Sequence, residues 1–356
     1  MIIDNHTHIF PFLGSNSEYK LEKTQMMYAQ KLISDHFEDT RRIGDNAIVK
    51  SIIWDKDKPG IEGMHDVNFH AGRFGRYEWT ENGTDYYKQY MPVHLQDMTS
   101  PPEFLIAQIN RIGVDKAVLQ RGHIYGKLEN YYCDAIRKFP DRFIGLTQID
   151  ESIAYEDGQI EELERNIKIL KLKGLYFEPG ALFKNGFRNN FDSGVFDIFW
   201  NHVETLHIPL YMQTDLSKFI DQMERLERIL VRHPEICAVI SLGLPLPVAL
   251  EDGRIRIPDV ISRLVTQHKV FLEIAYPISV GRLHDYPFAE AQKLISTLYD
   301  TFGPGRLVWG SDVPNVERYC TYAQSLRYIT DYCKFLTTSD RTLIFSQNVL
   351  QIFGIE

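Results

Sequence analysis

The sequence is poor in cysteine, and the few cysteines show no pairing pattern. There are four in 356 residues, Cys133, Cys237, Cys320 and Cys333, and none has Cys-x-x-Cys spacing. Disulfide frameworks and zinc ribbons need matched sets or close pairs of cysteines. Both classes are therefore excluded, and we expect reduced thiols in a cytoplasmic protein.

Long apolar runs and clusters of positive charge are also missing. No apolar stretch approaches the ~20 residues that cross a bilayer, and Met1 leads into an apolar pair without the basic start of a signal peptide. The net charge is -9, with Lys+Arg 39 against Asp+Glu 48 and no run of lysine or arginine. Because phosphate binding relies on clustered positive charge, we expect neither nucleic acid nor a membrane as a partner.

The composition is that of a large globular chain, with 44% hydrophobic and 24% charged residues. From residue 99 onward, short apolar stretches alternate with segments of helical periodicity. Eight strands are predicted, at residues 2–5, 116–120, 143–148, 174–177, 208–212, 237–242, 270–274 and 307–309. Eight strands alternating with helices predict an α/β fold, and the count favours a (β/α)8 TIM barrel over an open doubly wound sheet.

Residues 9–99, after the first strand, interrupt this alternation of strands and helices. They contain many aromatic residues and are too apolar for a linker, and so long a loop without structure is unusual in a compact domain. We expect a single TIM-barrel domain over 1–356, with an insertion subdomain over 9–99 packed near the barrel mouth. Within it we predict a helix at 19–36 and short strands at 49–54. The sequence does not distinguish two roles for this insertion: it could cover one flank of the barrel, or it could form a lid over the substrate.

Two histidines, His6 and His8, stand one residue apart at the end of the first strand. Side chains of a strand alternate between its faces, so both imidazoles should point the same way and could begin a metal site. Far downstream, Asp312 directly follows the last strand. A carboxylate there meets the histidines only if the sheet closes on itself, so the two motifs predict each other.

Active sites of such barrels lie at the carboxyl ends of the strands. The residues that follow each apolar run are far more polar than the strands themselves. This ring contains His6, His8, Gln120, Arg121, His123, Gln148, Asp150, Tyr176, Glu178, Gln213, Asp215, Ser241, Glu273, Tyr276 and Asp312.

Three segments resemble the amidohydrolase superfamily: IDNHTH at 3–8, RLVWGSDVP at 306–314 and NVLQIFG at 348–354. The chain is most similar to its amidohydrolase-related branch, which contains aminocarboxymuconate semialdehyde decarboxylase-like enzymes and several lactonases. The resemblance implies that His6 and His8 bind a metal. It also implies that Asp312 is a ligand that moves a proton to or from water on that metal.

The chain departs from this branch at two positions. The branch usually has a metal-binding histidine after the fifth strand, where this chain has Gln213, and a His-x-Gly after the sixth, where it has Ser241-Leu242-Gly243. Glutamine binds first-row metals less well than imidazole. A compensating group is expected, with Glu178 as the first choice of ligand and His123 as the second. The alternative for Glu178 is an ordinary surface glutamate before the Pro179-Gly180 turn, and the alternative for His123 is a solvated or hydrogen-bonded side chain.

We expect the polar ring to bind the substrate through Arg121, His123, Tyr176 and Gln213. Arg121 could form a bidentate contact with a substrate carboxylate, although a structural ion pair is the alternative. The cofactor is expected to be one divalent metal ion, zinc first and manganese second. Oligomeric state is not specified by the sequence, and a homodimer is the default.

The leading hypothesis is a metal-dependent hydrolase that acts on a small carboxylate-bearing cyclic or unsaturated substrate through metal-activated water. The first alternative is a non-oxidative decarboxylase (a carboxy-lyase) on the same site. The second alternative is a degenerate barrel that binds a small molecule without turnover, which the two missing histidines support.

Overall fold

The computed structural model describes residues 1–21, 23–275 and 285–355. Its largest sheet has eight strands in the order β1-β6-β7-β8-β9-β10-β13-β14, and all of its strand pairs are parallel. The strands are β1 (Ile3–Thr7), β6 (Lys116–Leu119), β7 (Phe143–Thr147), β8 (Gly174–Phe177), β9 (Leu210–Gln213), β10 (Ala238–Ser241), β13 (Val270–Glu273) and β14 (Leu307–Val308). All eight predicted strands are confirmed.

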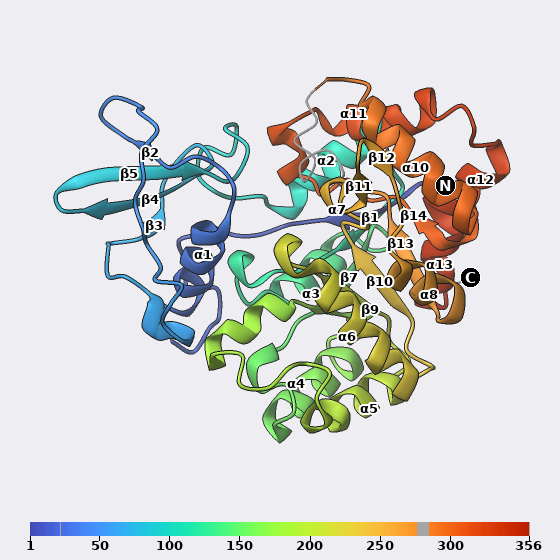
Figure 1. Cartoon of the computed structure of the whole chain (residues 1–356), viewed down its shortest axis with the longest axis horizontal. Helices are drawn as coiled ribbons and strands as arrows, with labels where there is room; N and C mark the ends of the chain where they lie inside the picture. The colour runs from blue at the N-terminus through green and yellow to red at the C-terminus, as the bar shows by residue number, and fades with distance from the viewer. Residues whose placement is uncertain (22, 276–284, 356) are drawn as a thin grey trace.

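The last strand returns to the first and nearly closes the sheet (Figure 1). The backbone N–H of Asn5 donates to Trp309 O at 3.0 Å, and the N–H of Asp312 donates to His6 O at 2.8 Å. A further bridge joins Thr7 to Val313. The predicted (β/α)8 barrel is therefore confirmed, and it places Asp312 beside His6.

Helices surround the barrel and turn one apolar side toward it. In α6 (Phe219–Arg232), the buried Phe219, Met223, Leu226 and Leu230 recur at helical spacing. The other helices of the barrel and the C-terminal region are α2 (Pro102–Ile112), α3 (Glu129–Lys138), α4 (Asp157–Lys168), α5 (Asp197–Thr205), α7 (Leu246–Ala249), α8 (Asp259–Gln267), α10 (Ala289–Phe302), α11 (Tyr322–Arg327), α12 (Thr338–Thr342) and α13 (Asn348–Phe353). No helix in the described ranges is long and apolar enough to cross a membrane.

The strands are buried on both faces, which explains their continuous apolar sequences. Inside the barrel, Ile3, Val118, Ile144, Val239 and Val308 form one cluster. Their neighbours along the strands pack outward against the helices. Polar side chains are left for the strand ends and the loops that follow them. A short hairpin of β11 (Leu250–Glu251) and β12 (Arg254–Ile255) lies outside the barrel sheet.

The segment between β1 and β6 contains α1 (Thr24–Asp35) and a four-stranded antiparallel sheet in the order β2-β5-β4-β3. Its strands are β2 (Arg41–Arg42), β3 (His70–Ala71), β4 (Arg76–Glu81) and β5 (Thr84–Gln89). The predicted helix is present, but the prediction of strands at 49–54 is wrong. Trp54 forms only an isolated bridge with Met64 and packs its ring against Phe183.

The main hairpin of this sheet had a sequence signal that we missed. Glu81 pairs with Thr84 across Asn82-Gly83, and both turn residues have positive φ, 51° and 75°. An Asn-Gly pair suits the tight hairpin turn that needs two such residues. The sequence therefore contained a signal for two paired strands within 76–89, and not for strands at 49–54.

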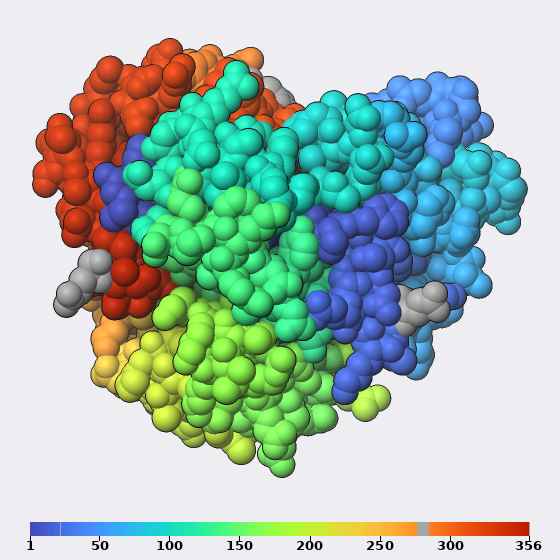
Figure 2. All heavy atoms as spheres, turned by 180° about the vertical axis from the view of Figure 1, so that it is seen from behind, coloured from blue at the N-terminus to red at the C-terminus, as the bar shows by residue number. Residues whose placement is uncertain are grey.

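The segment contacts the barrel through loops that leave the carboxyl ends of its strands. Helix α1 packs on the 3-10 turn His123–Tyr125 after β6, and the turn Gly60–Gly63 packs on Pro179–Asn185 after β8. Figure 2 shows the blue N-terminal part lying against the green part of the chain. These contacts lie on the mouth side of the barrel. The division into a barrel and an insertion subdomain stays a prediction.

Candidate metal centre

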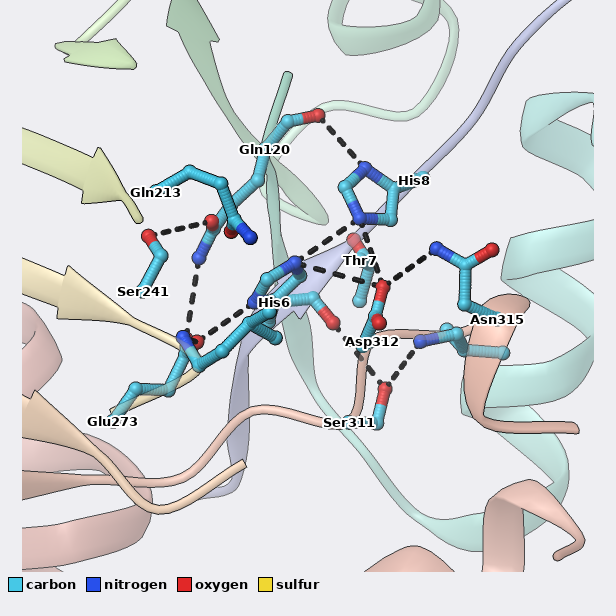
Figure 3. Close-up of polar contacts among 12 residues, drawn as sticks. His6, Thr7, His8, Gln120, Gln213, Ser241, Glu273, Ser311, Asp312 and Asn315 are labelled. Carbon is cyan, nitrogen blue, oxygen red and sulfur yellow. Dashed lines mark hydrogen bonds and ion pairs between the residues drawn. The ribbon is translucent and has the colours of Figure 1, made fainter. Parts of the chain in front are cut away.

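His6, His8 and Asp312 meet at the mouth of the barrel and form the ligand triad (Figure 3). Nε2 of His8 lies 3.0 Å from Nε2 of His6 and 3.0 Å from Oδ1 of Asp312, and the third separation is 3.6 Å. The three residues are 2 to 4% exposed. The sequence prediction that these groups converge agrees with this geometry.

The outer nitrogens of the two rings show that both Nε2 atoms are available as ligands. Nδ1 of His8 lies 3.2 Å from the carbonyl oxygen of Gln120, which can only accept, so Nδ1 carries the hydrogen. Nδ1 of His6 lies 2.7 Å from Oε2 of Glu273, which as a carboxylate also accepts. In neutral rings both Nε2 atoms then carry lone pairs, and two lone pairs at 3.0 Å repel unless a proton or a metal ion lies between them.

This donor set fits a divalent metal ion. Zinc bonds to imidazole nitrogen and carboxylate oxygen at about 2.0–2.2 Å in tetrahedral sites, which places neighbouring donors about 3.3–3.6 Å apart. The observed separations of 3.0 to 3.6 Å are close to this range. Two imidazoles and one carboxylate are also a set that first-row transition metals prefer.

Glu273, at the end of β13, supports the triad through its carboxylate, and each of the two carboxylate oxygens has two hydrogen-bond partners. Its Oε2 accepts from His6 Nδ1 and from the backbone N–H of Leu242, both at 2.7 Å. Its Oε1 accepts from Asn5 Nδ2 at 2.8 Å and from Gln120 Nε2 at 3.2 Å. A carboxylate behind a metal-binding histidine fixes the ring and makes it a better ligand. Glu273 belongs to the polar ring of the sequence, but no role was predicted for it.

The two positions where histidines were expected are used differently. Ser241 is buried and donates to Gln120 Oε1 at 3.0 Å, so it holds a residue that in turn contacts Glu273. Gln213 is partly exposed, and its Oε1 accepts from the Tyr176 hydroxyl at 3.2 Å. No described residue accepts from Gln213 Nε2. The structure therefore brings Tyr176 and Gln213 together, and Figure 3 shows Gln213 on the same side of the barrel as the triad.

The backbone at Asp312 is held in an uncommon conformation. Its φ is 61°, in the left-handed region that few residues other than glycine adopt. Asn315 Nδ2 donates to Asp312 Oδ1 at 2.8 Å. Behind it, the buried Asp4 accepts from the hydroxyls of Ser311 and Tyr322 at 2.6 and 2.8 Å. Asp4 therefore anchors the loop that presents Asp312, a role that sequence analysis missed.

The charges of the triad favour an ionised carboxylate and a bound cation or proton. Burial lowers the pKa of His6, but the carboxylates of Glu273 and Asp312 outweigh it and raise that pKa to about 9. Burial lowers the pKa of His8. Burial raises the pKa of Asp312, but the His6 charge and the His8 hydrogen bond bring it below its usual value. Burial also raises the pKa of Asp4 to about 6.

Glu178 and His123 lie in a different group, the second cluster, together with Glu151. His123 Nε2 lies 2.5 Å from Glu151 Oε2, and its Nδ1 lies 2.7 Å from the Tyr19 hydroxyl. Glu178 therefore lies apart from the ligand triad, although we predicted that it would complete that triad. His123 has partners on both ring nitrogens, so contact with substrate stays a prediction. Glu151 was missed, although it directly follows Asp150 of the polar ring.

Arg121 is buried in an ion pair. Its Nη1 lies 2.9 Å from Oε1 of Glu129, its Nη2 donates to Gly126 O, and its guanidinium lies over the Tyr132 ring. This is the structural ion pair that sequence analysis left open, and the assignment of Arg121 to the substrate stays a prediction. Tyr276 lies outside the described residues.

A barrel with two histidines at the end of its first strand and an aspartate after its last has the architecture of the amidohydrolase enzymes. The amidohydrolase family profile matches residues 3–355, so the chain belongs to that family. No curated protein matches it in sequence.

Solved structures share its fold at low sequence identity. A probable 2-pyrone-4,6-dicarboxylic acid hydrolase from Acinetobacter baumannii has a TM-score of 0.55 and 17% identity, covering 73% of this chain and 91% of that one. A 5-carboxyvanillate decarboxylase from Sphingomonas paucimobilis has a TM-score of 0.51 and 14% identity, with 73% and 84% covered. An amidohydrolase from Burkholderia multivorans has a TM-score of 0.57 and 12% identity, with 73% and 90% covered.

Proposed function

We propose that this protein is a metal-dependent hydrolase of a small carboxylate-bearing cyclic or unsaturated substrate. The observation that carries the proposal is the orientation of His6 and His8, whose Nε2 atoms face each other at 3.0 Å beside Asp312. A divalent ion held there, zinc first and manganese second, supplies Lewis-acid activation of water at neutral pH.

The protein's own groups can move the proton that hydrolysis requires. Asn315 Nδ2 donates to Asp312 Oδ1, and His8 Nε2 lies 3.0 Å from the same oxygen. No described residue donates to Oδ2, so that oxygen is open to take a proton from water and return it to the leaving group. Gln213 Nε2 and the adjacent Tyr176 hydroxyl offer polar contacts to a substrate.

The proposed substrate class is supported by the names of the structural neighbours, which describe a pyrone dicarboxylic acid and a carboxylated vanillate. Because one of these neighbours is a decarboxylase, non-oxidative decarboxylation is the second candidate function. Both reactions use a site that can hold a metal near a carboxylate, and they differ in the product released.

The experiment is a metal analysis of the purified protein, followed by assays of the metal-loaded enzyme. Lactones, amides and aromatic or unsaturated carboxylic acids are incubated with it, and ring opening and carbon dioxide are measured separately. Hydrolysis without carbon dioxide supports the proposal, whereas carbon dioxide release supports the decarboxylase. Saturable binding without any product supports the degenerate barrel, and failure to retain zinc or manganese contradicts the metal-dependent mechanism.

A further inference from the structure

The second cluster, formed by His123, Glu151 and Glu178, has no part in the proposed reaction. One imidazole and two carboxylates offer ligand atoms that all lie within 4.8 Å of one another. They come from the loops after β6, β7 and β8, so three separate parts of the chain converge. His123 and Glu151 are buried, and Glu178 is partly buried.

The carboxylates are held so that one oxygen of each is left for a ligand. Glu151 Oε1 accepts from Gln148 Nε2 at 2.8 Å and from the N–H of Glu178 at 3.0 Å, which leaves Oε2 facing His123. Glu178 Oε2 accepts from Gln148 Nε2 at 2.8 Å and from the N–H of His123 at 3.0 Å. No described residue donates a hydrogen bond to Glu178 Oε1.

Gln148 and Tyr19 complete the surroundings that metal ligands usually have. The N–H of Gly122 donates to Gln148 Oε1 at 3.1 Å, which turns the amide so that its nitrogen serves both carboxylates. On the other side of His123, the Tyr19 hydroxyl lies 2.7 Å from Nδ1, and the Tyr28 ring stacks on the imidazole at 4.0 Å. Ligands that are themselves hydrogen-bonded in this way are typical of metal sites.

Negative charge exceeds positive charge around the cluster. Glu151, Glu178 and the neighbouring Asp150 are three carboxyl groups, and Lys184 pairs only with Asp150. One buried and one partly buried carboxylate that share a pocket with one imidazole need a further cation or protons to offset their mutual repulsion.

The geometry points to a second divalent-metal site at His123, Glu151 and Glu178, separate from the ligand triad. The nitrogen and oxygen donors suit a first-row transition ion such as Zn²⁺ or Mn²⁺. The proton that His123 Nε2 and Glu151 Oε2 now share leaves as the ion enters. Because Tyr19 and Tyr28 of the N-terminal segment hold His123, the ion would also fasten that segment to the barrel mouth.

The test is the number of metal ions bound per full-length chain after loading with Mn²⁺ or Zn²⁺ and removal of excess. We expect two in the natural protein. We expect one in Glu178→Gln, because glutamine can keep both hydrogen bonds to Oε2 but is a poor ligand. We also expect one in the double variant His8→Ala with Asp312→Asn. Glu161→Gln, which removes an exposed carboxylate from α4, should still bind two.

A second variant and a direct measurement guard against misfolding. His123→Phe keeps an aromatic ring against Tyr28 while removing both nitrogens, and thermal unfolding shows whether each variant is folded. Anomalous diffraction from Mn²⁺-soaked crystals should give a peak beside Glu178 Oε1.

The outcomes separate this proposal from the proposed function. One ion that is lost in the double variant but kept in folded Glu178→Gln overturns the second site and leaves the hydrolase proposal standing. One ion with the opposite pattern supports the second site and contradicts the first. No ion in any folded form overturns both.

Discussion

Nδ1 of His6 lies 2.7 Å from Oε2 of Glu273, although 267 residues separate them in the sequence. This contact sets which nitrogen of His6 carries hydrogen and turns the other toward His8 and Asp312. The ligand triad therefore depends on a residue that cannot itself be recognised as part of a metal motif.

Replacing Glu273 by glutamine should weaken metal binding. The amide lacks the negative charge that strengthens His6 as a ligand, and it cannot accept all four hydrogen bonds. We expect a loss of roughly 10- to 100-fold in affinity, the usual effect of removing such a partner. Competition with a chelator measures it. Glu227→Gln, which breaks a partly exposed ion pair with Arg263, is the control and should bind metal normally. Equal affinity in both variants would show that Glu273 does not support the site.

Asp312→Asn should keep the fold and lower turnover. Asparagine tolerates the left-handed backbone at this position, where φ is 61°. It cannot act as a proton carrier, so kcat should fall by about 100-fold or more on the best substrate. Steady-state kinetics at matched metal content provides the measurement. Unchanged turnover would remove Asp312 from the catalytic role.

Metal affinity should rise with pH up to about pH 9. In the metal-free protein, the carboxylates around His6 outweigh the effect of burial and raise its pKa to about 9, so His6 carries a proton at neutral pH. A metal must displace that proton, and the apparent dissociation constant should fall about tenfold per pH unit below that pKa and then level off. Calorimetry at pH 7 in buffers of different ionisation enthalpy should detect proton release at the triad, measured in Glu178→Gln to isolate it. A pH-independent affinity would contradict this.

Gln213→His should raise metal affinity. Gln213 is partly exposed, and among the described residues its side chain is hydrogen-bonded only to Tyr176, so its replacement breaks a single contact. We expect the metal affinity to increase by roughly tenfold or more. Residues that only hydrogen-bond to a metal ligand already change the affinity by about that much. Tyr176→Phe, which removes only the hydroxyl that contacts Gln213, is the control for local disturbance. No gain in a folded variant would mean that this position does not face the metal.

Gly310→Ala should destabilise the protein and the metal site together. A Cβ at Gly310 would lie 2.5 Å from His6 Cβ and 2.8 Å from Glu273 Oε1, so the strand ends would have to separate. We expect a loss of about 1–3 kcal/mol in the free energy of unfolding, the usual cost of overpacking. Gly305→Ala, where the new Cβ meets nothing within 4 Å, is the matched control. Urea unfolding of both variants measures the difference, and equal stabilities would contradict the packing argument.

Much of the metal centre was predictable because its signals are local. The His-x-His spacing puts two side chains on one face of a strand whatever the rest of the chain does. The partners of these residues were harder to foresee. Glu178 and Glu273 both follow apolar strands, yet the first joins His123 and Glu151 while the second supports His6. Strand-end position alone cannot distinguish the two glutamates.

The sequence by itself determined the eight-stranded barrel, since continuous apolar strands alternating with amphipathic helices can bury their surfaces in few other ways. It also determined which end of the barrel carries the polar groups. Only the tertiary structure decided which of those groups meet. Contacts such as Ser241 with Gln120, or Arg121 with Glu129, depend on loop conformations and side-chain rotamers. Those are set by packing against residues distant in the sequence, such as Asp4 against Ser311 and Tyr322, and no local pattern encodes them.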